Sequence, residues 1–292
     1  MKHIKITLLV TMLVPAPTWA NKFQVSPVTP ELYAIETTSH GCENGEHDLV
    51  ERLLKPNSIV FDIGANAGDY TDFILGLRKN SQVYAFEPLP DIFQKLQKRF
   101  MPTPRHCEEQ SDAAIHLPTQ LAMTAATGNL HLFQLGIFSA PTTKTIWHCV
   151  DIPELSSIYD RQLNDPIKSY SFNYQPIEIS TDSLDHFCTT HQINHIDYLK
   201  IDTEGAELDV LQGATQLLTN SQIDYIQFEY GGTYPDAGIT LKAVYEYLTQ
   251  YNYQIYRISR WQLTKIDTWQ DWMENYKYGN FLAVRSGKEL KV

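Results

Sequence analysis

The chain has 292 residues and is 43% hydrophobic, which is enough to bury one large core and excludes disorder of the chain as a whole. Its net charge of -11 at pH 7, with no visible stripe of Lys and Arg, argues against a general nucleic-acid-binding protein, because neutralising phosphates requires clustered cations. The cysteines show no C-x-x-C spacing and are too sparse for a disulfide scaffold, so we predict no metal site and interpret them as ordinary thiols: Cys42, Cys107, Cys149 and Cys188.

The first twenty residues differ in kind from the rest. Lys2, His3 and Lys5 precede an apolar run from Ile6 to Val14, and small residues follow up to Ala20. This order is typical of a signal peptide and is too short for a stable membrane span; the alternative is a plain apolar tail. We expect residues 21–292 to form a single domain with its core at about 56–286.

Strand and helix alternate after residue 55, and two consecutive β-α units predict a parallel sheet. Ser58 to Ile63 (SIVFDI) and Gln82 to Phe86 (QVYAF) have the composition of buried strands. Two helices follow them, each with apolar residues at helical spacing: Tyr70, Phe73, Ile74 and Leu77 in one, and Ile92, Phe93 and Leu96 within Asp91 to Phe100 in the other.

The middle of the chain is harder to assign. Residues 102–119 contain three prolines and no clear period, which predicts a loop or insertion. Strands are expected at Leu130 to Leu135 and Gln175 to Ile179, with an irregular stretch between them. The later expected elements are a strand at Tyr198 to Asp202, a helix through Leu208, Leu211 and Leu218, a strand at Tyr225 to Glu229, a helix through Leu241, Val244, Tyr245 and Leu248, and strands at Tyr253 to Ile258 and Asn280 to Val284.

The four strongest predicted strands all end in carboxylates, although the strands themselves are apolar. The acids are Asp62, Glu87, Asp202 with Glu204 after it, and Glu229. Ligands of an open parallel sheet bind beyond the carboxyl ends of the strands, near the point where strand order reverses. The strand ends are therefore where we expect a site.

The first strand leads into a glycine turn, D-I-G-A-N-A-G, from Asp62 to Gly68. Gly64 and Gly68 allow a sharp turn and a close approach to a ligand, and the next helix offers amide hydrogens at its start. The turn has neither the G-x-G-x-x-G spacing of dinucleotide sites nor the G-K-[ST] of phosphate loops. A nucleoside without phosphates is favoured, with Asp62 available for a cationic group; the alternative is a plain tight turn.

Glu87 makes this interpretation more specific. It lies 23 residues after Gly64 at the end of the adjacent strand, where an acid accepts hydrogen bonds from both ribose hydroxyls. A glycine turn and a ribose acid together predict a nucleoside site much more strongly than either feature alone.

The third constellation is K-I-D-T-E-G-A-E, from Lys200 to Glu207. Asp202 and Glu204 stand at a strand end facing the same expected cleft, and Glu229 ends the neighbouring strand. For Asp202 the alternative is a helix cap. Glu207 falls in the first helical turn, where the helix dipole favours negative charge. It is therefore either a site residue or simply a residue that stabilises the start of the helix.

Read together, the blocks FDIGANAGDYT, VYAFEPLP, YLKIDTEGAELDVLQGA and IQFEY resemble the FkbM family of S-adenosylmethionine-dependent methyltransferases. The match runs from about residue 31 to 286, and Thr181 to Phe187 (TDSLDHF) resembles the T-x-L-D segment that this family places before its K-I-D strand. The resemblance implies a Rossmann-like, class I methyltransferase fold, a mostly parallel seven-stranded sheet with helices on both faces. It also implies O-methylation of a hydroxyl on a sugar, glycan or secondary metabolite, with the cofactor held by Asp62, Gly64, Ala65, Asn66, Gly68 and Glu87.

The chain departs from the family pattern at two places. Residues 102–119 interrupt the region where the adenine-contacting residue would lie, so that residue is not assigned. The signal-like N-terminus also conflicts with a cofactor made in the cytoplasm, where the family's enzymes are expected to work; an exported or membrane-associated location is the alternative.

Methyl transfer from a sulfonium requires an aligned acceptor oxygen and removal of its proton. Asp202 is our first choice of general base and Glu204 the second, with Glu229 as a further catalytic candidate. A carboxylate at Asp202 could equally position the methionine amine or bind a divalent ion with Glu204 and Glu229.

The acceptor pocket is expected to use the variable middle and an aromatic C-terminal region: Trp261, Trp269, Trp272, Tyr276 and Tyr278. These rings could equally pack the last helix and strands. Two other classes of protein stay open: an exported, inactive ligand-binding protein of the same fold, and an oxidoreductase, which the missing third glycine disfavours. The sequence does not predict an oligomeric state.

Overall fold

The computed structural model describes residues 23–33, 45–77, 80–101, 123–124, 129–159 and 172–291. The N-terminal segment, the insertion at 102–119, Cys42 and Cys107 lie outside these ranges, so what the sequence predicts for them stays a prediction. Cys149 and Cys188 are buried free thiols. No helix in the described ranges has the length and apolar character needed to cross a membrane.

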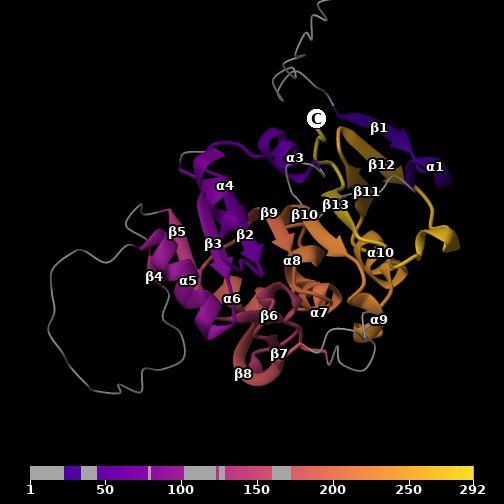
Figure 1. The fold of residues 1–292 in the computed structure, drawn as a ribbon. Helices are drawn as coiled ribbons and strands as arrows, with labels where there is room; N and C mark the ends of the chain where they lie inside the picture. The colour runs from indigo at the N-terminus through magenta and orange to yellow at the C-terminus, as the bar shows by residue number, and fades with distance from the viewer. Residues whose placement is uncertain are drawn as a thin grey trace, which may run out of the picture.

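A ten-stranded sheet forms the centre of the fold, and a three-stranded sheet stands apart from it (Figure 1). The strands of the large sheet are, in spatial order, β1 (Gln24–Pro27), β12 (Gln262–Ile266), β11 (Tyr253–Ser259), β13 (Gly279–Arg285), β10 (Ile223–Tyr230), β9 (Ile196–Ile201), β2 (Ile59–Ile63), β3 (Gln82–Phe86), β5 (Leu130–Phe133) and β4 (Met123–Thr124). The small sheet has the order β6 (Gly136–Phe138), β8 (Tyr174–Ser183) and β7 (Thr142–Cys149).

The large sheet confirms the predicted mostly parallel arrangement. Neighbouring pairs are parallel from β10 through β9, β2 and β3 to β5, and β13 runs antiparallel between β10 and β11. The predicted number of seven strands is wrong for the sheet as described, because β12, β1 and β4 extend it at both edges. Strand order reverses between β2 and β9: the chain goes from β2 to β3 and β5 on one side, then crosses to β9 and β10 on the other.

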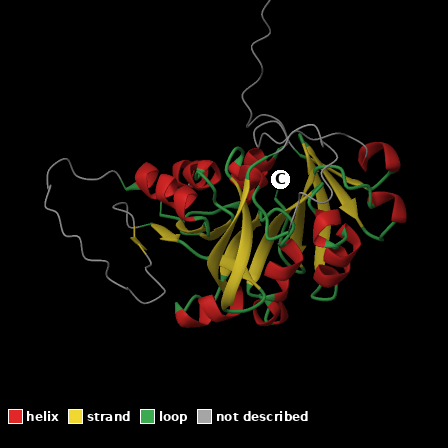
Figure 2. Ribbon diagram, turned by 60° about the horizontal axis from the view of Figure 1, so that its bottom comes forward, coloured by secondary structure: helices red, strands yellow, loops and turns green. Residues whose placement is uncertain are grey.

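Helices cover both faces of the large sheet, as predicted (Figure 2). Three helices pack their apolar residues with one face: α3 (Glu46–Leu53), α4 (Asp69–Leu77) and α5 (Pro90–Phe100). Four others pack with the opposite face: α6 (Leu184–Thr190), α7 (Glu207–Gln212), α8 (Thr215–Thr219) and α10 (Leu241–Thr249). The shorter helical segments are α1 (Pro30–Tyr33), α9 (Tyr234–Ala237) and the 3-10 turns Pro153–Leu155 and Asp271–Met273.

The single helix predicted through Leu208, Leu211 and Leu218 is two helices, α7 and α8. Gly213 lies between them, where a Cβ atom would stand 2.0 Å from the main-chain oxygen of Phe138 on β6. Glycine at this position lets the small sheet approach α7 closely. The helix is therefore interrupted where the small sheet contacts it. Helical periodicity in the sequence does not predict such a tertiary contact.

The T-D-S-L-D segment supports two helices. Ser183 caps α6 by accepting a hydrogen bond from the His186 amide. Asp185 accepts hydrogen bonds from the main-chain amides of Gln216 (2.8 Å) and Leu217 (3.0 Å) at the start of α8. This segment therefore fixes the connections that lead to β9 and β10.

Candidate active site

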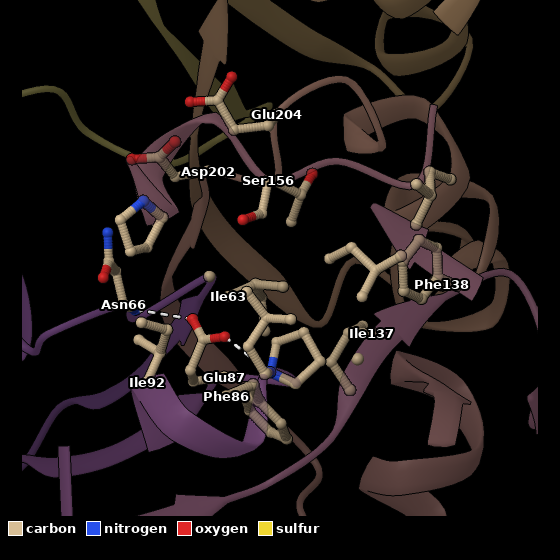
Figure 3. Close-up of a pocket in the computed structure, with 18 of the residues that line it drawn as sticks. Ile63, Asn66, Phe86, Glu87, Ile92, Ile137, Phe138, Ser156, Asp202 and Glu204 are labelled. Atoms are coloured by element: carbon tan, nitrogen blue, oxygen red, sulfur yellow. Dashed lines mark hydrogen bonds between the residues drawn. The ribbon is translucent and has the colours of Figure 1, made fainter. Parts of the chain in front are cut away.

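A cavity of about 280 Å³ opens at the carboxyl edge of the parallel strands, beside the point where strand order reverses (Figure 3). Three segments predicted from the sequence meet there: the glycine turn after β2, the end of β3, and the loop after β9. The predicted site residues that line it are Gly64, Asn66, Glu87, Asp202, Glu204 and Glu229. Asp62, Ala65 and Gly68 are not among its lining residues.

The two glycines of the turn are explained by contacts within the chain. Gly64 has φ +83, and a Cβ there would lie 1.9 Å from the main-chain oxygen of Asp202. Gly68 has φ +87, and a Cβ there would lie 2.6 Å from side-chain atoms of Leu96 and Phe100 on α5. Ligand approach, the reason predicted for both residues, is compatible with Gly64, which lines the cavity; Gly68 is required by the packing of α5.

Glu87 is held rigidly at the cavity wall although its side chain is only 5% exposed. Its Oε2 accepts a hydrogen bond from the Asn66 amide (3.0 Å) and its Oε1 accepts one from the Leu89 amide (2.9 Å), shown as dashed lines in Figure 3. Burial raises the pKa of Glu87 to about 7, against the opposing effect of the two amides. The carboxyl group is therefore both fixed in direction and close to titrating at neutral pH.

Asp62 is buried and does not line the cavity. Its Oδ2 accepts a hydrogen bond from the Thr71 hydroxyl (2.6 Å), while its buried Oδ1 makes no hydrogen bond with any described residue. Burial raises the pKa of Asp62, and the Lys200 ammonium and Thr71 oppose that rise. A direct contact between Asp62 and a ligand thus stays a prediction, as it does for Ala65 and Gly68.

The buried charges near Asp62 follow from strand register. Asp62 on β2 pairs with Lys200 on β9, and Lys200 pairs with Gln227 on β10, so these side chains share one face of the sheet. Lys200 donates a hydrogen bond to Asp202 Oδ2 (2.7 Å), and its ammonium lies 4.9 Å from the ring centroid of Tyr70. The buried Lys200 ammonium therefore stabilises the ionised forms of both Asp62 and Asp202.

The carboxyl groups of Asp202 and Glu229 carry different charges. Burial acts to raise the pKa of Asp202, but the Lys200 ammonium and hydrogen bonds from Glu229 and Lys200 outweigh it and hold the pKa below the usual value. Burial and the Asp202 charge raise the pKa of Glu229 well above the usual value. At neutral pH Asp202 is therefore ionised, while Glu229 retains its proton and donates to it.

Glu204 completes the acidic group. Its backbone has φ +53, and its main-chain oxygen accepts a hydrogen bond from Ser157 Oγ (2.8 Å) in the loop after β7. One oxygen each from Asp202, Glu204 and Glu229 lie within 4.8 Å of one another, a spacing that could also hold a cation. The structure thus brings the three predicted catalytic residues together.

Glu207 is a structural residue, as the simpler of its two interpretations predicted. Its carboxyl oxygens accept hydrogen bonds from the amides of Thr203 (2.9 Å) and Gly205 (3.1 Å) and from the Thr203 hydroxyl (3.0 Å). Burial raises its pKa to about 7. Glu207 fixes the loop that carries Asp202 and Glu204.

Of the five C-terminal aromatic residues proposed for the pocket, Tyr278 lines the cavity described here. The three tryptophans pack elsewhere, which favours the alternative of structural packing: Trp261 lies against Phe23, Trp269 against Tyr245, and Trp272 against Tyr33. Tyr276 is 40% exposed and stacks on Tyr230.

The apolar wall of the cavity comes from the middle of the chain, the region that the sequence predicted for the acceptor pocket without naming residues. Its residues belong to the small sheet and its connections: Leu135, Gly136, Ile137, Phe138, Ile146, Pro153 and Ile158, with the polar Ser156 among them. The run L-G-I-F at 135–138 was the available signal, because its apolar residues continue past the end of β5. Figure 3 shows Ile137 and Phe138 facing the cavity across from Asp202 and Asn66.

Comparison with known proteins identifies the family. Residues 62–255 match the model of the methyltransferase FkbM domain. The 2-O-methyltransferase NoeI of Sinorhizobium fredii is 24% identical over 211 residues, covering 70% of this chain and 76% of that protein. The hexuronic acid methyltransferase AglP of Haloferax volcanii is 23% identical over 225 residues, covering 75% of each.

Solved structures also align with this chain. A methyltransferase FkbM from Methylobacillus flagellatus shares 15% identity and aligns with a TM-score of 0.49, over 87% of this chain and 50% of that one. A Streptococcus mutans protein solved in complex with SAH shares 12% identity over 82% of this chain and 94% of that one, with a TM-score of 0.39. From the family match over 62–255, the chain belongs to the FkbM methyltransferase family and is an S-adenosylmethionine-dependent methyltransferase.

Proposed function

We propose that this protein transfers the methyl group of S-adenosylmethionine to a hydroxyl group of a sugar or glycan. The observation that carries the proposal is that Glu87 and the acidic group around Asp202 line one cavity, because methyl donor and acceptor must meet in one site. The relative named as a 2-O-methyltransferase supports transfer to oxygen, and the one named as a hexuronic acid methyltransferase supports a sugar over a secondary metabolite as the acceptor.

The residues around Glu87 fit the nucleoside part of the cofactor. Each Glu87 oxygen accepts one main-chain hydrogen bond and has further acceptor capacity, which suits the two ribose hydroxyls. Apolar side chains beyond it, Ile92, Leu135 and Ile137, suit a flat base. We infer that Glu87 holds the ribose and that Gly64 and Asn66 border it.

The cofactor supplies an electrophilic methyl group on a sulfonium, so the protein need not assist the leaving group. We infer that Asp202 receives the proton of the acceptor hydroxyl, because it is the carboxylate held ionised by Lys200. Its low pKa is no obstacle, since an attacking oxygen becomes strongly acidic as its bond to carbon forms. Glu229, protonated, instead fixes the direction of the Asp202 carboxylate.

The test uses the purified protein, S-adenosylmethionine with a deuterated methyl group, and a panel of hexuronic acids, neutral hexoses and disaccharides. Mass spectrometry of the sugars should show the added deuterated methyl group. Asp202→Asn should lower the rate by about 10²- to 10⁴-fold, the usual contribution of a general base, with SAH affinity retained. Asp209→Asn is the matched control, since Asp209 pairs with Lys144 at 3.2 Å outside the cavity.

The results separate the competing interpretations. Binding of SAH without methylation of any sugar would refute the sugar acceptor. Unaltered transfer by Asp202→Asn would remove that residue from the reaction and leave Glu204 as the next candidate.

A further inference from the structure

The C-terminal strand brings a tyrosine to the acidic side of the cavity. Because β13 runs antiparallel to β10, it begins at the edge where β10 ends, and Asn280 pairs with Glu229 in the register. Tyr278 directly precedes β13 and lines the cavity. Cross-strand partners have Cβ atoms about 4.5–5.5 Å apart, so Asn280 lies next to Glu229.

A buried chain of hydrogen bonds fixes the Tyr278 hydroxyl. Asn280 Nδ2 donates to Tyr278 Oη (2.8 Å) and also to Glu46 Oε1 (2.6 Å). Gln227 Nε2 donates to the other oxygen, Glu46 Oε2 (2.5 Å). Since a carboxylate only accepts, the Asn280 nitrogen must face Glu46, and this orients its second hydrogen toward Tyr278.

The members of this chain are deeply buried, with exposed fractions of 6% for Glu46, 3% for Asn280 and 1% for Gln227. A buried carboxylate is costly unless it is hydrogen-bonded, and both Glu46 oxygens are. Glu46, Tyr278 and Asn280 all lie outside residues 62–255, the part that matches the family model. The chain therefore adds to the active site a tyrosine that the family match does not include.

We propose that Tyr278 is an acceptor-binding residue that hydrogen-bonds the sugar oxygen next to the one that is methylated, and that Asn280 and Glu46 are positioning residues for its hydroxyl. This inference rests on the proposed sugar O-methylation. It assigns the site a preference for vicinal diols.

The chemistry of the groups supports this assignment. Burial, together with nearby acidic groups that include the ionised Asp202, raises the pKa of Tyr278 above its usual value, so the phenol is a neutral donor at physiological pH. Asp202 accepts a proton, whereas Tyr278 offers one. Two neighbouring hydroxyl groups match this pair, since one gives its hydrogen to the carboxylate while the other accepts from the phenol.

The experiment compares Tyr278→Phe with the wild type on the sugar that the wild type methylates best in the panel, and on its deoxy analogue lacking the neighbouring hydroxyl. Loss of one hydrogen bond should raise the KM of the full sugar about 3- to 10-fold, with kcat changed less than twofold and the SAH Kd unchanged. The deoxy sugar should show no such difference. Tyr276→Phe is the matched control, because it removes a hydroxyl two residues away on the same segment, outside the cavity lining.

Asn280→Ala tests the positioning role. It should raise the KM of the full sugar by a similar factor, and in the double variant with Tyr278→Phe the two effects should not multiply, because Asn280 acts through Tyr278. Urea unfolding of each variant reports any loss of stability separately from the KM.

The outcomes distinguish the two proposals. Methylation by the wild type with the same KM for Tyr278→Phe would overturn the role of Tyr278 alone. Equal losses by Tyr278→Phe on the full and deoxy sugars would overturn the assignment to the neighbouring oxygen. If the wild type methylates no sugar, the proposed function fails and this inference fails with it.

Discussion

We expect Glu87, the residue proposed to hold the ribose, to make nucleoside binding sensitive to pH in the neutral range. Burial is the largest cause that raises its pKa to about 7, and nearby Asp91 and Asp62 add to the rise while the amides of Leu89 and Asn66 oppose it. Ribose hydroxyls donate hydrogen bonds, so they bind the ionised carboxylate better than the neutral acid. We therefore expect the affinity for a nucleoside to fall as the pH falls through 7.

The size of the effect follows from the titration. If only the ionised form binds, the apparent Kd is multiplied by one plus the ratio of protonated to ionised Glu87. With a pKa of about 7, that factor is about 11 at pH 6, about 2 at pH 7 and about 1.1 at pH 8. The Kd should thus rise about tenfold from pH 8 to pH 6, and nucleoside binding at pH 6 should be accompanied by proton release.

Calorimetry with adenosine measures this directly, since adenosine has no group that titrates between pH 6 and pH 8 and lacks the amino-acid part of the cofactor. Glu87→Gln should bind adenosine weakly at every pH. Glu207→Gln is the matched control, because Glu207 is another buried glutamate with a pKa near 7 but does not line the cavity. The reasoning is refuted if the wild-type Kd is the same at pH 6 and pH 8, or if Glu87→Gln keeps the pH dependence.

Three further substitutions, with Gly76→Ala as a control, test the packing and charges around the cavity. Gly64→Ala should lower the free energy of unfolding, measured by urea unfolding without ligand, by about 2–5 kcal/mol, because the backbone is left-handed and a Cβ would overlap with Asp202. Gly76→Ala, in an open position on α4, should raise the same free energy by about 0.5–1 kcal/mol. Gly213 does not have a left-handed backbone, so Gly213→Ala should lower the free energy of unfolding by about 1–3 kcal/mol, only by pushing β6 away. Unchanged stability and adenosine affinity would count against the close contact. Lys200→Met should remove the cation that keeps the pKa of Asp202 low, so burial should raise that pKa. The free energy of unfolding should then fall more in the variant than in the wild type as the pH rises from 5 to 8. Parallel pH profiles of stability would contradict this.

The sequence predicted the elements of the central sheet well because their signals are local. Gln82 to Phe86 is β3 with the same bounds, and Tyr225 to Glu229 lies within β10. Each is an apolar run followed by a charged or turn-forming residue, and burial on both faces maintains such a pattern. The prediction that the strand-end acids meet also succeeded for Glu87, Asp202, Glu204 and Glu229, since parallel strands end at one edge.

What the sequence did not reveal depends on contacts between distant segments. Thr142–Cys149 was interpreted as irregular, but its polar first half is stabilised by pairing along its whole length with Tyr174–Ser183. A contact between Asp62 and a cationic group of the ligand stays a prediction, but the sequence did not reveal that Asp62 is buried. Its burial against Thr71 depends on how α4 packs over β2, and the motif does not encode that packing.

Strand register explains why charged residues below the cavity are tied to the chemistry proposed within it. Side chains two residues apart on a strand point to the same face, so Lys200, one level below Asp202, reaches the carboxylate at the edge. A one-residue slip of β9 would turn Lys200 and Asp202 to the other face and leave Asp62 without its cation. The charge state of Asp202 is therefore a property of the pairing of β2 with β9. Substitution of Lys200 should therefore alter the pH dependence of methyl transfer, although Lys200 does not line the cavity.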